Sequence, residues 1–207
     1  MNYFISAIGT DSGKTLASAI ITKALGADYW KPVQAGEPTD SSAIRQWIGD
    51  EQIIHPEAFY LKTPASPHYA AELENIELKI DQIQAPITKN HLVIEGAGGL
   101  MVPLNHSEFM IDLIPHFNAE LILICNVYLG SINHTILSLE AVARRGYAIK
   151  GIIFNGPDIK STKEIILNHC PAPCLLHIAE EEKIDIAVIE KYSEQLKNNW
   201  NELDRKR

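Results

Sequence analysis

The chain has 207 residues, of which 46% are hydrophobic, and a formal net charge of −8. This length suits one α/β domain with a buried core, and because no Gly/Ser/Pro-rich linker divides the chain, we expect a single domain over residues 1–207. The acidic balance argues against a nucleic-acid surface and against binding to anionic lipid. There is no signal-peptide pattern and no apolar run of about twenty residues, so we expect a cytoplasmic protein that does not enter a membrane.

Six apolar, β-rich segments recur along the chain, with helical patterns between most of them. The expected strands are residues 3–8, 29–33, 91–94, 121–127, 150–155 and 174–178. Near-continuous apolar strands separated by helices predict a parallel β-sheet flanked by helices on both faces. Ligands bind such sheets beyond the carboxyl ends of the strands, so the residues that follow each strand are the candidates for chemistry.

The first strand is followed by a loop that ends in Gly13-Lys14-Thr15 and then by a helical pattern. The N–H groups of such a loop and the positive end of the helix dipole converge on one anion, which predicts a phosphate site. Lys14 would reach the β- and γ-phosphates, and the Thr15 hydroxyl would hold Mg²⁺. The alternative is an ordinary strand–loop–helix connection. Ile8 replaces the first glycine of the usual pattern, but a loop counted from Ala7 keeps the length that a phosphate needs.

Charged residues mark the next two strand ends. Lys31 lies in an apolar strand, where it needs either Asp40 or Glu37 as a partner or an anionic ligand, and we favour the ligand. Asp40 precedes a helical pattern and is also a candidate N-cap. Glu95 follows the strand at 91–94 and precedes a glycine-rich segment, where an acid can hold the Mg²⁺ that Thr15 also contacts. The alternative for Glu95 is a solvated side chain on a glycine-rich turn.

Three other segments carry weaker signals. The N–H groups of Ser131 to Asn133, at the start of a helical pattern after residues 121–127, suit a carboxylate, and plain capping by Ser131 is the alternative. Ser66 lies between two prolines, in either a stiff loop that delivers a side chain or a connector. Asn155 ends a strand, and its amide is able to read a purine edge.

The rest of the chain is given no chemistry. A helix that continues to about Gln84 and an amphipathic helix over residues 184–207 are expected to be peripheral. The three cysteines are interpreted as structural thiols, since their spacing lacks further metal ligands: Cys125, Cys170 and Cys174. The histidines of three unrelated segments are likewise not assigned to a metal: His134, His169 and His177.

These motifs, in this order, resemble those of the dethiobiotin synthetases, ATP-dependent enzymes of biotin biosynthesis, from about residue 3 to about residue 178. The most specific are KPV with its following glycine, SPH and LGSINH. The resemblance implies a P-loop NTPase-like fold and a homodimer with shared active sites. It also implies that 7,8-diaminononanoate takes up CO₂ as a carbamate, that ATP phosphorylates the carbamate, and that the second amine closes a cyclic urea with release of ADP and phosphate.

The resemblance assigns roles to individual residues. The catalytic residues would be Lys14, Lys31 and Thr10, which act by positioning and electrostatics. The Mg²⁺ ligands would be Thr15, Asp40 and Glu95. The substrate contacts would be Thr10, Asp11, Lys31, Ala35 and Ser66, with Ser131, Ile132 and Asn133 of the neighbouring subunit. The ATP contacts would be Asp11, Ser12, Gly13, Lys14, Thr15, Leu16, Asp40, Glu95, Gly96, Ala97, Gly98, Asn155 and Gly156.

The phosphate loop departs from the family pattern, and two registers are possible. Matching the family's GTD to residues 9–11 deletes two loop residues. The ungapped register places Ala7, Ile8 and Gly9 where the family has Gly, Thr and Asp, and it keeps the loop length. We adopt the ungapped register, in which Thr10 lies beside the γ-phosphate and Asp11 near the substrate amines.

Two further departures concern the substrates. Ala35 stands where the family often has Ser or Thr, so one hydroxyl contact to the substrate is missing. The segment after Leu176 lacks the longer, proline-containing stretch that usually completes the adenine pocket. A loosened preference for ATP is therefore a hypothesis.

The main alternative function is a nucleotide-operated switch of the chromosome-partition or division-site type, which shares this fold. Such proteins usually carry an extra lysine early in the phosphate loop, where this chain has Ala7, Ile8 and Gly9. The tail is also not a basic amphipathic membrane helix. An amidotransferase synthetase of the cobalamin pathway would need a separate glutaminase domain, for which the chain is too short. The sequence therefore favours the ligase.

Overall fold

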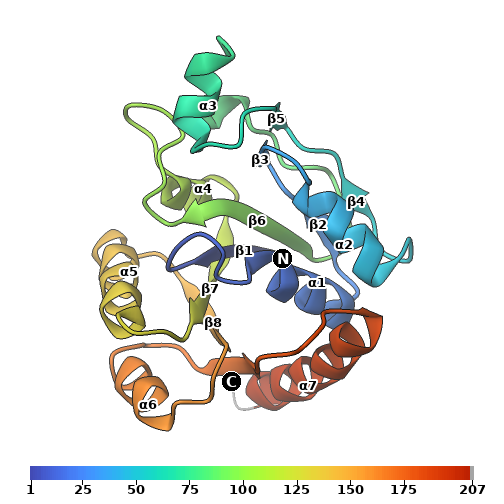
Figure 1. The fold of residues 1–207 in the computed structure, drawn as a ribbon, viewed down its shortest axis with the longest axis vertical. Helices are drawn as coiled ribbons and strands as arrows, with labels where there is room; N and C mark the ends of the chain where they lie inside the picture. Colours follow the sequence, from blue (N-terminus) through green and yellow to red (C-terminus); the bar gives the residue numbers. More distant parts are fainter. Residues whose placement is uncertain (206–207) are drawn as a thin grey trace.

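The computed structural model describes residues 1–205 and is built on a seven-stranded sheet of order β4-β2-β6-β1-β7-β8-β9 (Figure 1). Every neighbouring pair of these strands is parallel. The strands are β1 (Asn2–Ala7), β2 (Asp28–Trp30), β4 (Ile54–His55), β6 (Leu92–Gly99), β7 (Ala119–Asn126), β8 (Ile149–Asn155) and β9 (Cys174–Ile178). A separate two-stranded sheet pairs β3 (Val33–Ala35) with β5 (Phe59–Leu61). The predicted α/β fold with a parallel sheet is confirmed.

Helices cover both faces of this sheet (Figure 1). One face carries α1 (Lys14–Leu25), α2 (Asp40–Ile48) and α7 (Ile186–Arg205). The other carries α3 (Pro67–Leu73), α4 (Leu113–His116), α5 (Ser131–Arg145) and α6 (Lys160–Asn168). Two 3₁₀ turns lie at Ile80–Gln82 and Met110–Asp112.

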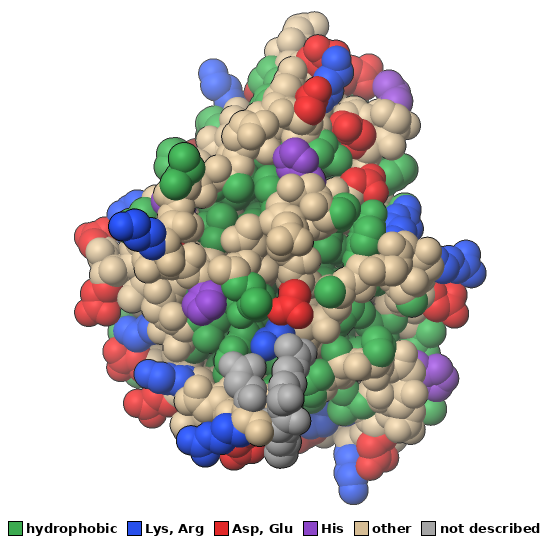
Figure 2. All heavy atoms as spheres, turned by 180° about the vertical axis from the view of Figure 1, so that it is seen from behind, with side chains coloured by type: hydrophobic (Ala, Val, Ile, Leu, Met, Phe, Trp, Pro, Cys, Tyr) green, Lys and Arg blue, Asp and Glu red, His purple; other side chains and the backbone are tan. Residues whose placement is uncertain are grey.

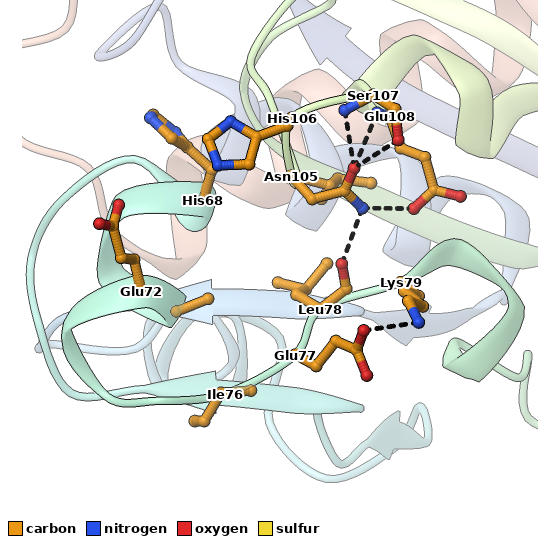
Figure 3. Close-up of a pocket in the computed structure, with 12 residues that line it drawn as sticks. His68, Glu72, Ile76, Glu77, Leu78, Lys79, Asn105, His106, Ser107 and Glu108 are labelled. Carbon is orange, nitrogen blue, oxygen red and sulfur yellow. Dashed lines mark hydrogen bonds and ion pairs between the residues drawn. The ribbon is translucent and has the colours of Figure 1, made fainter.

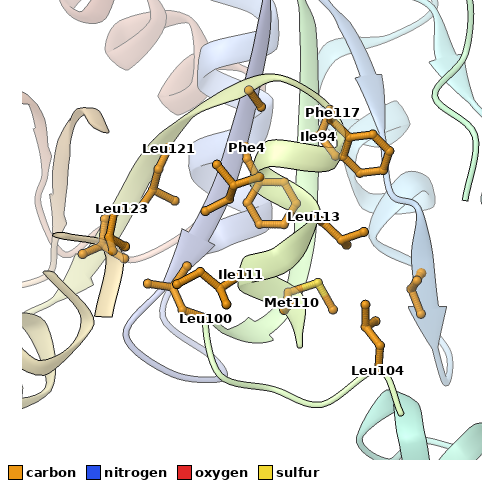
Figure 4. Packing of buried hydrophobic residues seen from close by; sticks show 14 of the residues in the cluster. Phe4, Ile94, Leu100, Leu104, Met110, Ile111, Leu113, Phe117, Leu121 and Leu123 are labelled. Atoms are coloured by element: carbon orange, nitrogen blue, oxygen red, sulfur yellow. The ribbon is translucent and has the colours of Figure 1, made fainter. Parts of the chain in front are cut away.

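The buried core consists of two layers, one on each face of the sheet. Successive side chains of β1 point to opposite faces, so Phe4 joins one layer while Tyr3 and Ile5 join the other. Figure 4 shows the first layer, where Phe4 packs among apolar side chains from the neighbouring strands and from the segment that contains Met110 and Leu113. Burial on both faces explains why the central strands are apolar almost throughout.

The strand expected at residues 29–33 is interrupted, so that prediction was wrong in extent. Pro32 has no N–H to donate to a ladder, and β2 ends at Trp30 before β3 begins at Val33. The Pro32 carbonyl instead accepts hydrogen bonds from the backbone N–H groups of Ala58 and Phe59, at 3.0 and 2.9 Å. The break places Lys31 directly at the carboxyl end of β2.

The strand expected at residues 91–94 is longer than predicted. It runs to Gly99, so Glu95 lies inside β6 rather than before a glycine-rich turn. The pairing of β6 with β1 shifts between Ile5, opposite Glu95, and Ala7, opposite Gly99. Gly98 has a φ of 64°, a backbone conformation that favours glycine at this irregularity.

The prediction of a helix that continues to about Gln84 was wrong. Helix α3 ends at Leu73, and Asn75 follows with a left-handed φ of 53° that stops the helix. Only the 3₁₀ turn Ile80–Gln82 lies beyond it. The helix expected over residues 184–207 is present as α7, and residues 206–207 lie outside the described part of the chain.

The surface carries mixed charge. Figure 2 shows the face opposite to that of Figure 1, where basic and acidic side chains alternate around the rim and do not gather into one basic area. Among residues 1–205, no helix combines the length and the apolar character needed to cross a bilayer.

Candidate active site

The carboxyl ends of β1, β2 and β6 open into one cavity of about 770 Å³. Most residues proposed from the sequence line it, although they come from five separate segments of the chain. They are Thr10, Asp11, Ser12, Gly13, Lys14, Thr15, Leu16, Lys31, Ala35, Asp40, Ser66, Glu95, Ala97 and Gly98.

The phosphate loop is braced from within and from β8. The Ser12 hydroxyl donates to the Gly9 carbonyl at 3.2 Å, and the Asn155 amide donates to the Ser12 carbonyl at 3.1 Å. Gly13 has a φ of 89°, and a Cβ at this position would lie 2.4 Å from Asn155 Nδ2. Helix α1 begins at the next residue, so its first N–H groups lie at the end of this tight loop.

Lys14 is largely buried, and its ammonium donates to the Gly9 carbonyl at 3.2 Å. Burial lowers the pKa of Lys14, while the attraction of Glu95 acts in the opposite direction. A phosphate bound by this loop would stabilise the charged ammonium.

Thr15 joins two carboxylates from different elements. Its hydroxyl lies 2.9 Å from Asp40 Oδ1 and 3.0 Å from Glu95 Oε1, close enough to donate to either. Asp40 is the first residue of α2, and Glu95 is fully buried in β6. Three oxygen ligands of the kind that Mg²⁺ prefers are therefore gathered in one place.

Lys31 lies between the same two carboxylates. Its ammonium is 2.5 Å from Asp40 Oδ2 and 3.2 Å from Glu95 Oε1, and it donates to the Gly96 carbonyl at 3.1 Å. The other partner considered from the sequence, Glu37, instead accepts a hydrogen bond from Tyr60 at 2.6 Å.

The pKa shifts of Lys31 and Asp40 both favour the charged forms of these two side chains. Burial lowers the pKa of Lys31, but the attraction of Glu95 and Asp40 outweighs burial and raises it above its usual value. Burial raises the pKa of Asp40, but the attraction of Lys31 outweighs burial and lowers it. Lys31 and Asp40 therefore form an ion pair at neutral pH.

Two alternatives from the sequence were wrong. The N-cap of α2 is Thr39, whose side chain accepts a hydrogen bond from the Ser42 N–H at 3.2 Å. Asp40 is the first residue of the helix, and its carboxylate faces the cavity and does not cap α2. Glu95 is not solvated, because its exposed fraction is 0%.

The donor set fits Mg²⁺. Among residues 1–205, no group of three or more His, Cys, Asp or Glu side chains is arranged to hold a metal ion. A Mg²⁺ held by Thr15, Asp40 and Glu95 would thus have two carboxylates and one hydroxyl from the protein. It would fill its other positions with water and phosphate oxygens, as is usual for this ion.

Two residues that the sequence reasoning missed support the cluster. The Tyr29 hydroxyl donates to Glu95 Oε2 at 3.0 Å, and burial, followed by the nearby Glu95 charge, raises the pKa of this phenol well above its usual value. The Gln34 side chain accepts from the Asp40 N–H at 3.1 Å and donates to the Gly36 carbonyl at 3.0 Å. The only available signal was that buried Tyr and Gln side chains need partners.

A second cavity, of about 500 Å³, adjoins the first, since Asp11 and Leu16 line both. It contains Asn155 and Gly156, the residues expected to contact the adenine. The short segment after Leu176 also reaches it, because Ala179 and Ile184 form part of its wall.

The start of α5 lies apart from both cavities. Ser131, Ile132 and Asn133 line neither of them. Plain capping by Ser131 was also wrong, because Gly130 is the N-cap and the buried Ser131 hydroxyl has no hydrogen-bond partner among the described residues. Gly96 lines neither cavity and takes part only through its carbonyl contact with Lys31.

A third cavity, of about 350 Å³, lies beside α3 and contains His68, which comes two residues after Ser66. Figure 3 shows that the Asn105 side chain donates to the Leu78 backbone carbonyl, at 2.8 Å, and also to the Glu108 carboxylate. The Ser66 hydroxyl lies 3.1 Å from His68 Nδ1. Residues 64–67 line the first cavity and His68 lines the third, so this segment borders both of them.

Comparisons with known proteins bear on this site. A family model described as an AAA domain matches residues 1–187. The ATP-dependent dethiobiotin synthetase of Cytophaga hutchinsonii is 54% identical over 203 residues, which cover 97% of this chain and 98% of that protein. The synthetase of Christiangramia forsetii is 44% identical over 205 residues, which cover 98% and 99%.

Solved structures share the fold at low identity. A putative plasmid partition protein from Borrelia burgdorferi has a TM-score of 0.63 at 11% identity, covering 97% of this chain and 98% of that one. The septum site-determining protein MinD from Pyrococcus horikoshii has a TM-score of 0.58 at 17% identity, covering 99% and 96%. Such likeness establishes a common fold, whereas the identity to the synthetases extends over nearly the whole chain. The chain belongs to the family of ATP-dependent dethiobiotin synthetases.

Proposed function

We propose that this chain is a Mg²⁺-dependent ligase of biotin biosynthesis that makes dethiobiotin from 7,8-diaminononanoate, CO₂ and ATP. The observation that carries the proposal is the single cavity in which Lys14, Thr15, Lys31, Asp40 and Glu95 meet, in a chain 54% identical to a named synthetase. Four of these five residues come from the start of a helix or the carboxyl end of a strand, and Glu95 lies within β6. Rigid elements therefore hold the charges in place before a ligand arrives.

ATP would lie along the phosphate loop, with its phosphates at the start of α1. Lys14 would stabilise the negative charge of the β- and γ-phosphates, while Ser12, Gly13 and Leu16 would border them. The Mg²⁺ held by Thr15, Asp40 and Glu95 would neutralise charge on the phosphate oxygens. Ala97 and Gly98 would line the opposite wall. Asn155 and Gly156, in the adjoining cavity, would face the adenine.

The diamine would lie on the other side of Lys31, whose ammonium would stabilise the carbamate and its mixed anhydride with phosphate. Thr10 and Asp11 are exposed at the mouth of the cavity, where they would contact the γ-phosphate and the substrate amines. Ala35 and Ser66 line the same cavity and would contact the body of the substrate. Catalysis would consist of positioning together with stabilisation of charge.

We also propose a homodimer with shared sites. Ser131, Ile132 and Asn133 lie away from their own cavity, so they would meet the substrate's tail carboxylate from a neighbouring subunit. The adjacent side chains Tyr128 and Leu129 are 42% and 102% exposed, which suits burial against a second copy. We further propose that residues 1–207 act as one cytoplasmic domain that binds neither nucleic acid nor membrane.

The partition- or division-type switch is the other candidate, because proteins of that kind share the fold. Their identity to this chain is 17% or less, so the likeness concerns the fold alone.

Product analysis of variants tests the proposal. The wild-type protein should convert diaminononanoate, bicarbonate, Mg²⁺ and ATP into a cyclic urea that is detected by its mass. Lys14→Ala and Glu95→Ala should abolish turnover while circular dichroism stays native. Phosphate release that ignores the diamine would favour the switch, and wild-type turnover in either variant would mean that the site is misplaced.

A further inference from the structure

We propose that Tyr29 is a positioning residue for the metal site: its hydroxyl holds one oxygen of the Glu95 carboxylate so that the other oxygen faces the metal. The inference rests on the Mg²⁺ site of the proposed function and adds a residue that the family motifs do not include. Tyr29 lines neither the first nor the second cavity, so it would contact neither nucleotide nor substrate.

The two oxygens of Glu95 have different neighbours. Oε2 accepts the Tyr29 hydroxyl at 3.0 Å, and no other hydrogen bond to Oε2 is found within residues 1–205. Oε1 lies 3.0 Å from the Thr15 hydroxyl and 3.2 Å from the Lys31 ammonium. One oxygen is thus fixed inside the protein, and the other belongs to the cluster proposed to hold Mg²⁺.

Strand register explains how Tyr29 reaches this carboxylate. β2 and β6 are parallel, and Tyr29 pairs with Val93. Side chains two residues apart point to the same face of a strand, so Tyr29 and Lys31 share a face, as do Val93 and Glu95. Tyr29 therefore lies beside Val93, two residues before Glu95 on that face, and the long phenol lets its hydroxyl reach Glu95 Oε2.

Burial makes this hydrogen bond matter. Tyr29 and Glu95 are each 0% exposed, so water cannot replace the hydroxyl if it is removed. A buried carboxylate oxygen without a donor is costly, and the carboxylate would turn toward the remaining donors. This rotation would move Oε1 away from the position that a metal ligand needs. Partners behind metal ligands typically change metal affinity by about 10- to 100-fold.

A purely structural role for Tyr29 predicts a different result. The ring belongs to the core layer that includes Val93 and Ile44, so a structural residue would lower stability when altered and leave metal affinity unchanged. The two roles are separated by measuring metal affinity directly in folded protein.

The experiment measures Mn²⁺ affinity by the electron paramagnetic resonance signal of free Mn²⁺, in the presence of a non-hydrolysable ATP analogue. Tyr29→Phe should weaken Mn²⁺ binding by about 10-fold or more and raise the Mg²⁺ concentration for half-maximal turnover to match. Binding of the analogue without metal should stay near wild type. The matched control is Tyr3→Phe in β1, which removes a buried hydroxyl that contacts the Met1 sulfur, and it should leave Mn²⁺ affinity unchanged.

Further variants keep the outcomes distinct. Glu95→Gln must weaken Mn²⁺ binding if the proposed metal site is correct, and unchanged affinity there would refute the site itself. Weakened binding in Glu95→Gln with unchanged binding in Tyr29→Phe would overturn only the role of Tyr29. If Tyr29→Phe does not fold, 4-methylphenylalanine at position 29 keeps the volume without a donor and should weaken binding. 4-Aminophenylalanine at the same position keeps a hydrogen-bond donor and should restore Mn²⁺ binding. Equal affinity in these two proteins would also overturn the inference.

Discussion

Replacement of Lys31 by methionine tests the ion-pair cluster most severely. The change removes the ammonium that lies 2.5 Å from Asp40 and 3.2 Å from Glu95 and keeps most of the apolar stem. Glu95 is fully buried and the Lys31 side chain is 4% exposed, so water cannot substitute for the lost charge. The two carboxylates would then face each other without the ammonium that lies between them.

The magnitude follows from burial. Breaking a buried pair by removing one partner costs about 3–5 kcal/mol, because the remaining charge is left uncompensated. For a chain of this size, such a loss corresponds to a fall of roughly 6–20 °C in Tm. Lys23→Met is the matched control, since Lys23 pairs with Glu190 at the surface. This replacement should lower the free energy of unfolding by less than about 1 kcal/mol.

Urea unfolding across pH provides the assay. The pKa of Asp40 is lower in the folded protein than in the unfolded chain, where it is about 3.9. The contribution of Asp40 to stability is therefore present above the unfolded pKa and is lost as the pH falls through the folded pKa. The difference in the free energy of unfolding between wild type and Lys31→Met should therefore be largest near neutral pH and should shrink in acid. If the free energy of unfolding of Lys31→Met lies within about 1 kcal/mol of the wild-type value at neutral pH, the reasoning is refuted, since a loss that small is typical of a surface pair.

Two other predictions concern the phosphate loop and the core. Gly13→Ala should abolish ATP-analogue binding in calorimetry, because the new Cβ would lie 2.4 Å from Asn155 Nδ2. The control is Gly26→Ala, where φ is 57° and a Cβ would meet nothing within 4 Å, and it should lower stability without affecting binding. Retained binding in Gly13→Ala would contradict the loop geometry. Burial raises the pKa of the Cys125 thiol to about 12, so a disulfide reagent at neutral pH should label at most the two partly exposed thiols of the native protein and all three after unfolding. Rapid native labelling of Cys125 would show that this core strand opens.

Long, strongly patterned elements were predictable from the sequence. The Gly-Lys-Thr motif located the start of α1, and apolar continuity with flanking turns located β9 at Cys174–Ile178. Gly146, directly after the last residue of α5, has a φ of 69°, a conformation that glycine adopts readily at helix ends. In each case, local propensity and tertiary burial favour the same structure.

Short elements and the support behind the metal ligands were not predictable. β4 has two residues and β5 has three, too few for an alternation to be visible. Pro32 interrupts a segment that reads as one strand, and its carbonyl accepts hydrogen bonds from Ala58 and Phe59, which no local pattern indicates. Tyr29 reads as an ordinary core aromatic, because its partner Glu95 is 66 residues away. Contacts at such separation depend on strand order, which the sequence does not display.

The central claim is that separate strand ends gather one nucleotide, one divalent ion and one diamine in a common cavity. A crystal soaked with Mn²⁺, a non-hydrolysable ATP analogue and diaminononanoate tests it directly through the anomalous signal of the metal. One peak should appear about 2.1 Å from oxygens of Thr15, Asp40 and Glu95, with the γ-phosphate beside Lys14 and the diamine beside Lys31. A metal peak elsewhere, or a diamine bound away from the nucleotide, would show that no such common cavity operates.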